Sequence, residues 1–264
     1  ARVYFTDGGK GYIKYRKDGS ILEFASFYPE SAESPTGTPD PLNCNLELSA
    51  TSIVKMQGGY AEDGTNMLWE KQYFADGALK REGERIADDN YKVTEYHEDG
   101  VKLAGTYVYD KNGVAFSTVE FYPNGKTRLL VKKPDSYTTE TIEYFETGLR
   151  SKYHYVQHQH IIWETYREDG VTLVYRFEQK PDHQMYGTSW DMLATYYNED
   201  GTVDHERRFN RYNMYVYFKD DAGNVLYMQS WRNKKANQED MTYEPDQWVL
   251  EAILLDGDMI SSDS

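Results

Sequence analysis

The sequence predicts an all-β protein, an extended antiparallel sheet of tandem β-hairpins with one short C-terminal helix. Aromatic residues are abundant, with 25 Tyr, 10 Phe and 5 Trp among 264 residues, and such side chains favour the pleated, half-buried surface of a sheet. An aromatic residue recurs four positions before a glycine along most of the chain. Polar and apolar residues alternate beside these glycines, as in Thr118 to Tyr122, and alternation is the pattern of a strand.

The repeated glycines have the spacing of hairpins. Ten of eleven aligned glycines have Tyr or Phe four positions earlier, and only Gly223 departs, with Phe218 five positions before it. Consecutive glycines are mostly 11 to 13 or 22 to 23 residues apart, the length of one or two strands with their turns. The aligned glycines are Gly8, Gly19, Gly64, Gly77, Gly100, Gly113, Gly125, Gly148, Gly170, Gly201 and Gly223.

The residue before most of these glycines is Asp or Asn. An Asp or Asn side chain can bond the backbone two residues on, and the following glycine adopts positive φ without a Cβ clash. The pair therefore reverses the chain between two strands. We expect structural turn glycines at Gly100, Gly113, Gly125, Gly148, Gly170 and Gly201.

The length of the chain fits one hairpin-repeat domain spanning residues 1–264. Residues 29–45 contain four of the eight prolines, which predicts a long exposed loop. Near residues 245–255 the pattern changes, because Pro245 suits a first helical turn and Trp248, Ala252 and Leu255 share a helical face. With Gly257 placed as a cap, this stretch predicts a short helix.

The charge of the chain disfavours two classes of partner. Lys and Arg number 29 against 44 Asp and Glu, a formal charge of −15, and such a surface repels nucleic acid and anionic lipid. No apolar run approaches the length of a membrane span. Cys44 is the single cysteine, which favours a cytoplasmic location, with the cell surface or secretion as the alternative.

Motifs that would carry catalysis are missing from the sequence. It has no glycine-rich nucleotide loop, no GxSxG elbow and no HExxH helix. The repeated Glu-Asp-Gly triplets are interpreted as solvated turns. We therefore expect no catalytic residue, no cofactor and no chemistry from this chain alone.

Three histidines form one candidate metal site. His154, His158 and His160 fall in the stretch "YHYVQHQHIIW", and on a single strand they would share one face. Histidines two residues apart can bind one divalent metal. No cysteine or clear carboxylate completes the set, so we interpret them as solvent-facing side chains and expect no metal.

Aromatic residues of the repeat are the candidate binding residues. A row of aromatic rings on a sheet face can stack on sugars or peptide side chains. The alternative is cross-strand packing that stabilises the sheet. The candidates are Tyr96, Tyr109, Phe121, Tyr144 and Tyr166.

Two families resemble parts of the sequence. The recurring "YxxDG" looks like the YD-type hairpin repeats of bacterial surface and toxin-shell proteins. The chain ends resemble the extended β-sheet add-on domain of bacterial retaining glycosyltransferases that modify serine-rich adhesins or wall teichoic acids. That resemblance rests on "VYFTDGGKGYIKY", "YYNEDGTVDHERRF", "VYFKDDAGNVLYMQSW" and the closing "WVLEAILLDGDMISSD". It implies a non-catalytic role, because the nucleotide-sugar site would lie in domains outside this chain.

Two functional hypotheses follow. The first is an acceptor-binding or assembly module of a bacterial glycosyltransferase, whose partner is a polypeptide or polymer acceptor, or a second copy bound through the sheet. The alternative is a free-standing hairpin-repeat binding protein of the cell surface or of a toxin and immunity system. A third class, a hydrolase with acids lining a sheet face, has the least support.

Overall fold

A computed structural model describes most of the chain, and its contacts fall into two compact units, residues 1–127 and 128–264. The expectation of a single domain spanning residues 1–264 stays a prediction. The described residues are 2–4, 10–28, 53–64, 66–180, 191–209, 213–220, 222–233, 248–255 and 258–261. The proline-rich stretch 29–45 lies outside them.

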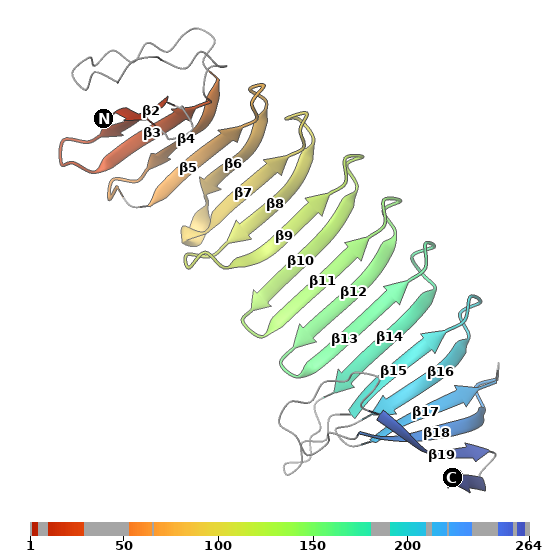
Figure 1. Ribbon diagram of the computed structural model, residues 1–264. Helices are drawn as coiled ribbons and strands as arrows, with labels where there is room; N and C mark the ends of the chain where they lie inside the picture. The colour runs from red at the N-terminus through yellow and green to blue at the C-terminus, as the bar shows by residue number, and fades with distance from the viewer. Residues whose placement is uncertain are drawn as a thin grey trace. The chain divides into compact units, whose positions relative to one another are not determined.

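Unit 1 is an antiparallel sheet in which each strand pairs with the next along the chain (Figure 1). A three-residue 3₁₀ turn, η1, joins β6 to β7. The elements are β1 (Arg2–Tyr4), β2 (Lys10–Tyr15), β3 (Ile21–Phe27), β4 (Val54–Tyr60), β5 (Met67–Tyr73), β6 (Leu79–Arg85), η1 (Ala87–Asp89), β7 (Tyr91–Tyr96), β8 (Leu103–Tyr109) and β9 (Ala115–Phe121).

Unit 2 repeats this arrangement, with each described strand antiparallel to the next. The all-β, antiparallel hairpin fold predicted from the glycine spacing is therefore confirmed. The strands are β10 (Thr127–Asp135), β11 (Thr138–Tyr144), β12 (Arg150–Gln157), β13 (His160–Tyr166), β14 (Leu173–Lys180), β15 (Asp191–Tyr197), β16 (Val203–Phe209), β17 (Asn213–Lys219), β18 (Val225–Asn233), β19 (Trp248–Leu255) and β20 (Asp258–Ser261).

The predicted C-terminal helix is wrong. Residues Trp248–Leu255 form strand β19, which pairs with β18 from Asn233↔Trp248 to Tyr227↔Leu255. A short apolar run fits a buried strand as well as a helix. Pairing with the preceding strand, β18, decides between them, since tertiary context overrides local propensity.

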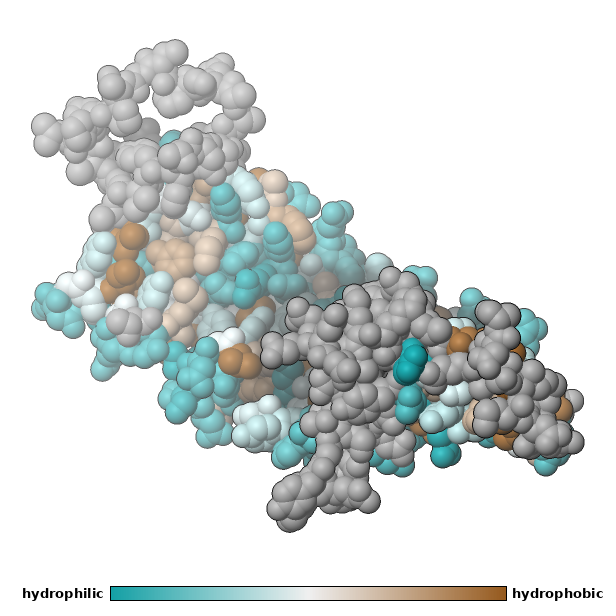
Figure 2. Space-filling model, turned by 60° about the horizontal axis from the view of Figure 1, so that its bottom comes forward, coloured by the Kyte–Doolittle hydropathy of each residue, from teal (hydrophilic) through white to brown (hydrophobic). Residues whose placement is uncertain are grey.

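Both faces of each sheet carry mixed polar and apolar side chains. The buried apolar residues of the described chain are Ala25, Phe27, Val93, Ile142, Met192, Ala194 and Val216. Figure 2 shows the same mixture on one face, where hydrophobic residues form separate patches among hydrophilic ones. Stability therefore depends on contacts between neighbouring strands, the unit of sheet stabilisation.

The turn encoded by Asp-Gly is a five-residue reversal with two backbone bonds. In the turn after β5, Phe74 N–H donates to Ala78 O at 2.8 Å and Gly77 N–H donates to Phe74 O at 3.0 Å. The Asp76 carboxylate accepts from Ala78 N–H at 2.9 Å, and Gly77 has φ +90°. Positive φ recurs at Gly100, Gly113, Gly125, Gly148, Gly170 and Gly201.

Three turns are one residue longer and touch a neighbouring turn. In the turn after β7, His97 N–H donates to Lys102 O at 2.8 Å. A Cβ built on Gly100 would lie 2.7 Å from Ala78 Cβ, whereas one built on Gly113 would meet nothing within 4 Å. Gly100 is therefore required by its conformation and by its neighbour. The longer turns contain Gly64, Gly100 and Gly170.

The aromatic residue four positions before the glycine is the last residue of its strand. Tyr96 closes β7 opposite Leu103, and the register shifts there, because Glu95 pairs with Gly105. The intervening Ala104 is thus the extra residue of a β-bulge, a feature that bends and twists a strand. The same register shift accompanies Tyr15, Tyr60, Tyr73, Tyr109, Tyr144, Tyr166 and Tyr197.

Candidate functional site

The five aromatic residues predicted to bind a ligand do not form one row. Tyr96 and Tyr109 are the last residues of the neighbouring antiparallel strands β7 and β8. They therefore lie where opposite ends of the two strands meet the turns. Phe121 is the last residue of β9 and lies at the same end of the strands as Tyr96. Tyr144 and Tyr166 belong to unit 2.

Two of the five come together around one arginine. Arg150 pairs with Tyr144 in the β11–β12 ladder, and its guanidinium lies 5.5 Å from the ring centre of Tyr166. It also lies 5.5 Å from the ring of Tyr153 and donates to the Tyr166 hydroxyl at 3.3 Å. Such contacts stabilise a sheet through cation–π attraction.

Tyr96 is held by a carboxylate. Its hydroxyl donates to Glu82 Oε1 at 2.6 Å. This hydrogen bond, helped by burial, raises the pKa of Tyr96 to about 12. The hydroxyl is thus engaged within the sheet.

A row of rings in mutual contact, here called the aromatic ladder, crosses five strands of unit 2. It consists of Tyr175, Tyr196, His205, Phe218 and Tyr227, one on each strand from β14 to β18. Successive ring centres are 5.0, 4.3, 5.5 and 4.2 Å apart. The Tyr196–His205 and Phe218–Tyr227 planes differ by only 10° and 12°.

From Tyr196 to Tyr227 the rings are stacked and cover part of one another's faces, whereas Tyr175 is tilted by 57° against Tyr196. The Arg207 guanidinium lies over the Tyr196 ring, 4.9 Å from its centre. We therefore assign the ladder to cross-strand packing.

Trp163 differs from the ladder in exposure and orientation. It lies in the middle of β13 and 51% of it is exposed. His154 meets it nearly edge-on, with ring centres 5.0 Å apart at 81°, and Phe177 lies 6.3 Å away at 58°. Neither neighbour stacks flat on the indole, so a broad aromatic surface stays open to solvent.

Polar side chains lie on the same face of the sheet as this indole. Two kinds of residue share one face of a sheet: those directly opposite one another on neighbouring strands, and every second residue along one strand. Lys152, two residues from His154, forms an ion pair with Glu143 at 3.0 Å. Burial lowers the pKa of His154, so its imidazole is neutral at about pH 7 and has one donor and one acceptor nitrogen. We call this set, Trp163 with His154, Phe177, Lys152 and Glu143, the Trp163 platform.

The three histidines do not share one face of a single strand. A hairpin turn at His158 and Gln159 separates β12 from β13, and His158 has φ +54°. His154 pairs with Trp163, whereas His160 is three residues from Trp163 and faces the opposite side. The expectation of one shared strand face is therefore wrong, because the chain reverses within the stretch.

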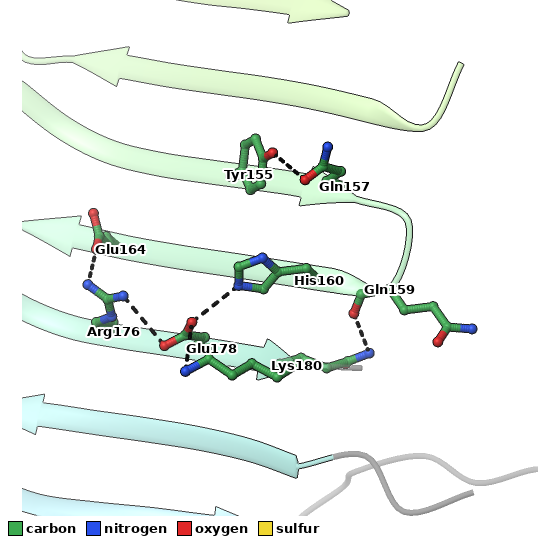
Figure 3. A network of polar contacts seen from close by, with 9 residues as sticks. Tyr155, Gln157, Gln159, His160, Glu164, Arg176, Glu178 and Lys180 are labelled. Carbon is green, nitrogen blue, oxygen red and sulfur yellow. Dashed lines mark hydrogen bonds and ion pairs between the residues drawn. The ribbon is translucent and has the colours of Figure 1, made fainter. Parts of the chain in front are cut away.

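The opposite face of the same strands carries a charged network (Figure 3). Arg176 contacts Glu164 at 2.8 Å and Glu178 at 3.5 Å. Glu178 also contacts His160 at 3.2 Å and Lys180 at 3.4 Å. Burial by itself raises the pKa of Glu178, but these contacts together outweigh it and lower that pKa.

Among the described residues, no three His, Cys, Asp or Glu side chains are arranged to hold a metal ion. No helix among them has the length and apolar character needed to cross a membrane.

Sequence reasoning missed Trp163 and the ladder. Their residues stand in alternating stretches such as Tyr175 to Glu178, which identified strands but not partners. Which rings meet depends on the register between strands, and spacing along the chain does not specify that register. The available signal was a tryptophan in the middle of an alternating strand.

Comparisons with known proteins add little. No family model matches the chain, and no curated protein matches it. Among solved structures, a TcdB2–TccC3 crystal structure is 9% identical, with a TM-score of 0.19, and the match covers all of this chain and 15% of that one. The Photorhabdus luminescens Tc holotoxin pore is 11% identical, with a TM-score of 0.18, covering 97% of this chain and 18% of that one. We base no argument on likenesses this low.

Proposed function

We propose that this chain is a hairpin-repeat binding protein that holds a carbohydrate against the Trp163 platform. One observation carries the proposal: Trp163 is a half-exposed indole in the middle of a strand. The other exposed large apolar residues described in unit 2 lie in turns or at the start of a strand. They are Tyr137, Leu149, Val171, Val225 and Leu226.

The chemistry of the platform fits a sugar ring. A pyranose has an apolar face of C–H groups, which carry slight positive charge, and an aromatic face is negative. Its hydroxyls extend sideways and need donors and acceptors. His154, Lys152 and Glu143 supply both kinds around the indole.

A broad protein interface fits less well. Such interfaces bury roughly 800 Å² on each partner around an apolar centre. The Trp163 platform has a single open ring with charged neighbours, and the adjacent ladder rings cover one another. A polymer that engages one ring per contact suits this surface better.

The wider class is the free-standing hairpin-repeat protein. The competing module of a glycosyltransferase depended partly on a closing helix, and that stretch is strand β19. The polypeptide acceptor and the self-association expected for such a module remain predictions. A carbohydrate polymer is the partner we propose here.

The test measures binding of soluble oligosaccharides. Cellohexaose, chitohexaose, maltohexaose and mannohexaose are titrated into the full chain, and indole fluorescence and heat are recorded. We expect saturable binding of at least one of them. We expect Trp163→Ala to weaken that binding by about tenfold or more, because a stacked aromatic anchor dominates such contacts.

Trp69→Ala is the matched control. Among the tryptophans whose exposure is described, Trp69 is the other exposed one, at 38%, and its indole lies over Gly59 in unit 1. It should bind the sugar like the unmodified chain. If none of the four sugars binds, or if Trp163→Ala binds as tightly as Trp69→Ala, the proposal is rejected.

A further inference from the structure

Unit 1 contains an apolar cavity that the sequence did not indicate. It has a volume of about 310 Å³ and lies along β2, β3 and β4. This is at the lower end of the range for small-molecule sites. The apolar side chains of Ile13, Ile21, Phe24, Met56 and Tyr60 are among those that line it.

A glycine shapes one wall of this cavity. The Phe24 ring lies over Gly58, and a Cβ built on that glycine would be 2.7 Å from the ring. Phe24 also meets Tyr60, with ring centres 6.0 Å apart. The wall is thus formed by rings whose positions depend on the missing side chain.

The guanidinium of Arg16 is hydrogen-bonded to two residues that line the cavity. The Arg16 guanidinium donates to Ile21 O at 2.6 Å and to Tyr60 O at 2.7 Å. Both carbonyls belong to residues that line the cavity. The charge is thus held next to Ile21 and Tyr60 by the backbone of two strands.

Among the described residues, no charged side chain lines the cavity itself. Burying an unpaired ionised group in such surroundings is costly. A ligand that fits has an apolar body for the cavity and an anionic end that stays beside Arg16. Arg16 donates from Nη1 to Ile21 O and Ser20 Oγ and from Nη2 to Tyr60 O, so its Nε–H and second Nη2–H can still donate to a carboxylate.

We propose that this cavity binds a small amphiphilic carboxylate, with its apolar part among Phe24, Met56 and Tyr60 and its carboxylate beside Arg16. The site belongs to unit 1 and is independent of the Trp163 platform. Binding of the carboxylate there requires only the cavity and the fixed guanidinium.

Calorimetric titration of the full chain with octanoate tests the proposal. Octanol and octylamine have the same apolar chain with a neutral or cationic end. We expect saturable octanoate binding, with octanol weaker by about tenfold, the effect of one charge-assisted hydrogen-bonded pair. Absence of saturable octanoate binding, or equal binding of all three, overturns the proposal.

Two substitutions locate the site. Met56→Trp fills the cavity and should abolish octanoate binding, whereas Arg16→Gln should bind octanoate no better than octanol. Trp163→Ala, in the other unit, should leave octanoate binding unchanged. Circular dichroism and melting confirm that each variant is folded. If Arg16→Gln does not fold, Arg16→Lys, which retains the charge, takes its place. Octanoate bound normally by folded Met56→Trp places the ligand elsewhere and rejects the site.

Discussion

The imidazole of His205 lies parallel to the phenol ring of Tyr196, with ring centres 4.3 Å apart and planes 10° from parallel. On its other side, His205 stacks on Phe218 at 5.5 Å. The imidazole Nδ1 is within hydrogen-bond distance, 2.8 Å, of Asp204 Oδ2. One side chain therefore joins three strands of a sheet through its two faces.

Removing a ring from the aromatic ladder should destabilise the protein. Phe218→Ala loses contacts with both His205 and Tyr227, and we expect a loss of about 2 kcal/mol, since Phe218 is half-buried. Urea unfolding measures this. Leu226→Ala, at a residue 53% exposed, should change stability by less than about 0.5 kcal/mol. Similar losses for the two variants would contradict the ladder's role.

Two turn glycines should respond differently to alanine. Gly113→Ala introduces only the strain of positive φ, about 1 to 2 kcal/mol. Gly100→Ala adds a clash with Ala78 and with Leu79 N, 2.7 and 2.9 Å from the new Cβ, and should cost more. Urea unfolding of both variants compares them. Equal losses would show that the contact between turns does not matter.

Stability should fall at alkaline pH because of buried tyrosines. Burial raises the pKa of Tyr91 and of Tyr175 to about 12, and the Glu82 hydrogen bond does so for Tyr96. Above about pH 10 the unfolded chain loses these protons while the folded chain keeps them until about 12. The contribution is complete below pH 10 and is lost as pH rises.

Melting temperature against pH, with ultraviolet absorbance of tyrosinate, measures this loss. Tyr175→Phe removes one of the groups and should flatten the alkaline decline. Tyr137→Phe changes a turn residue that is 66% exposed and should leave the decline as it was. If Tyr175→Phe has the same alkaline profile as Tyr137→Phe, burial of Tyr175 is not the cause.

The charged network should make the protein sensitive to acid. The contacts of Glu178 with His160, Lys180 and Arg176 hold its pKa below the ordinary value of 4.5. This stabilisation is present above that value and is lost as pH falls through the lower pKa of the folded state. Glu178→Gln should therefore reduce the acid dependence of the melting temperature. Glu199→Gln, in an exposed turn, should not, and an unchanged profile for Glu178→Gln would refute this.

The sequence by itself determined the strands and the turns. Asp-Gly and Asn-Gly pairs specify local backbone geometry, because positive φ and the Asx hydrogen bond involve residues only a few positions apart, as at Asp76 and Gly77. The recurring aromatic four positions earlier marked each strand's end, as Tyr96 does. An antiparallel hairpin fold follows from such local signals.

Only the tertiary structure decided which side chains meet. Residues Trp248–Leu255 form a strand because β18 pairs with them, and the helical spacing of their apolar residues could not reveal that partner. His154 and His160 face opposite sides because the chain reverses at His158. The ladder from Tyr175 to Tyr227 and the open indole of Trp163 depend on the register of successive strands. Shifting that register by one residue would exchange the faces, and spacing along the chain does not contain it.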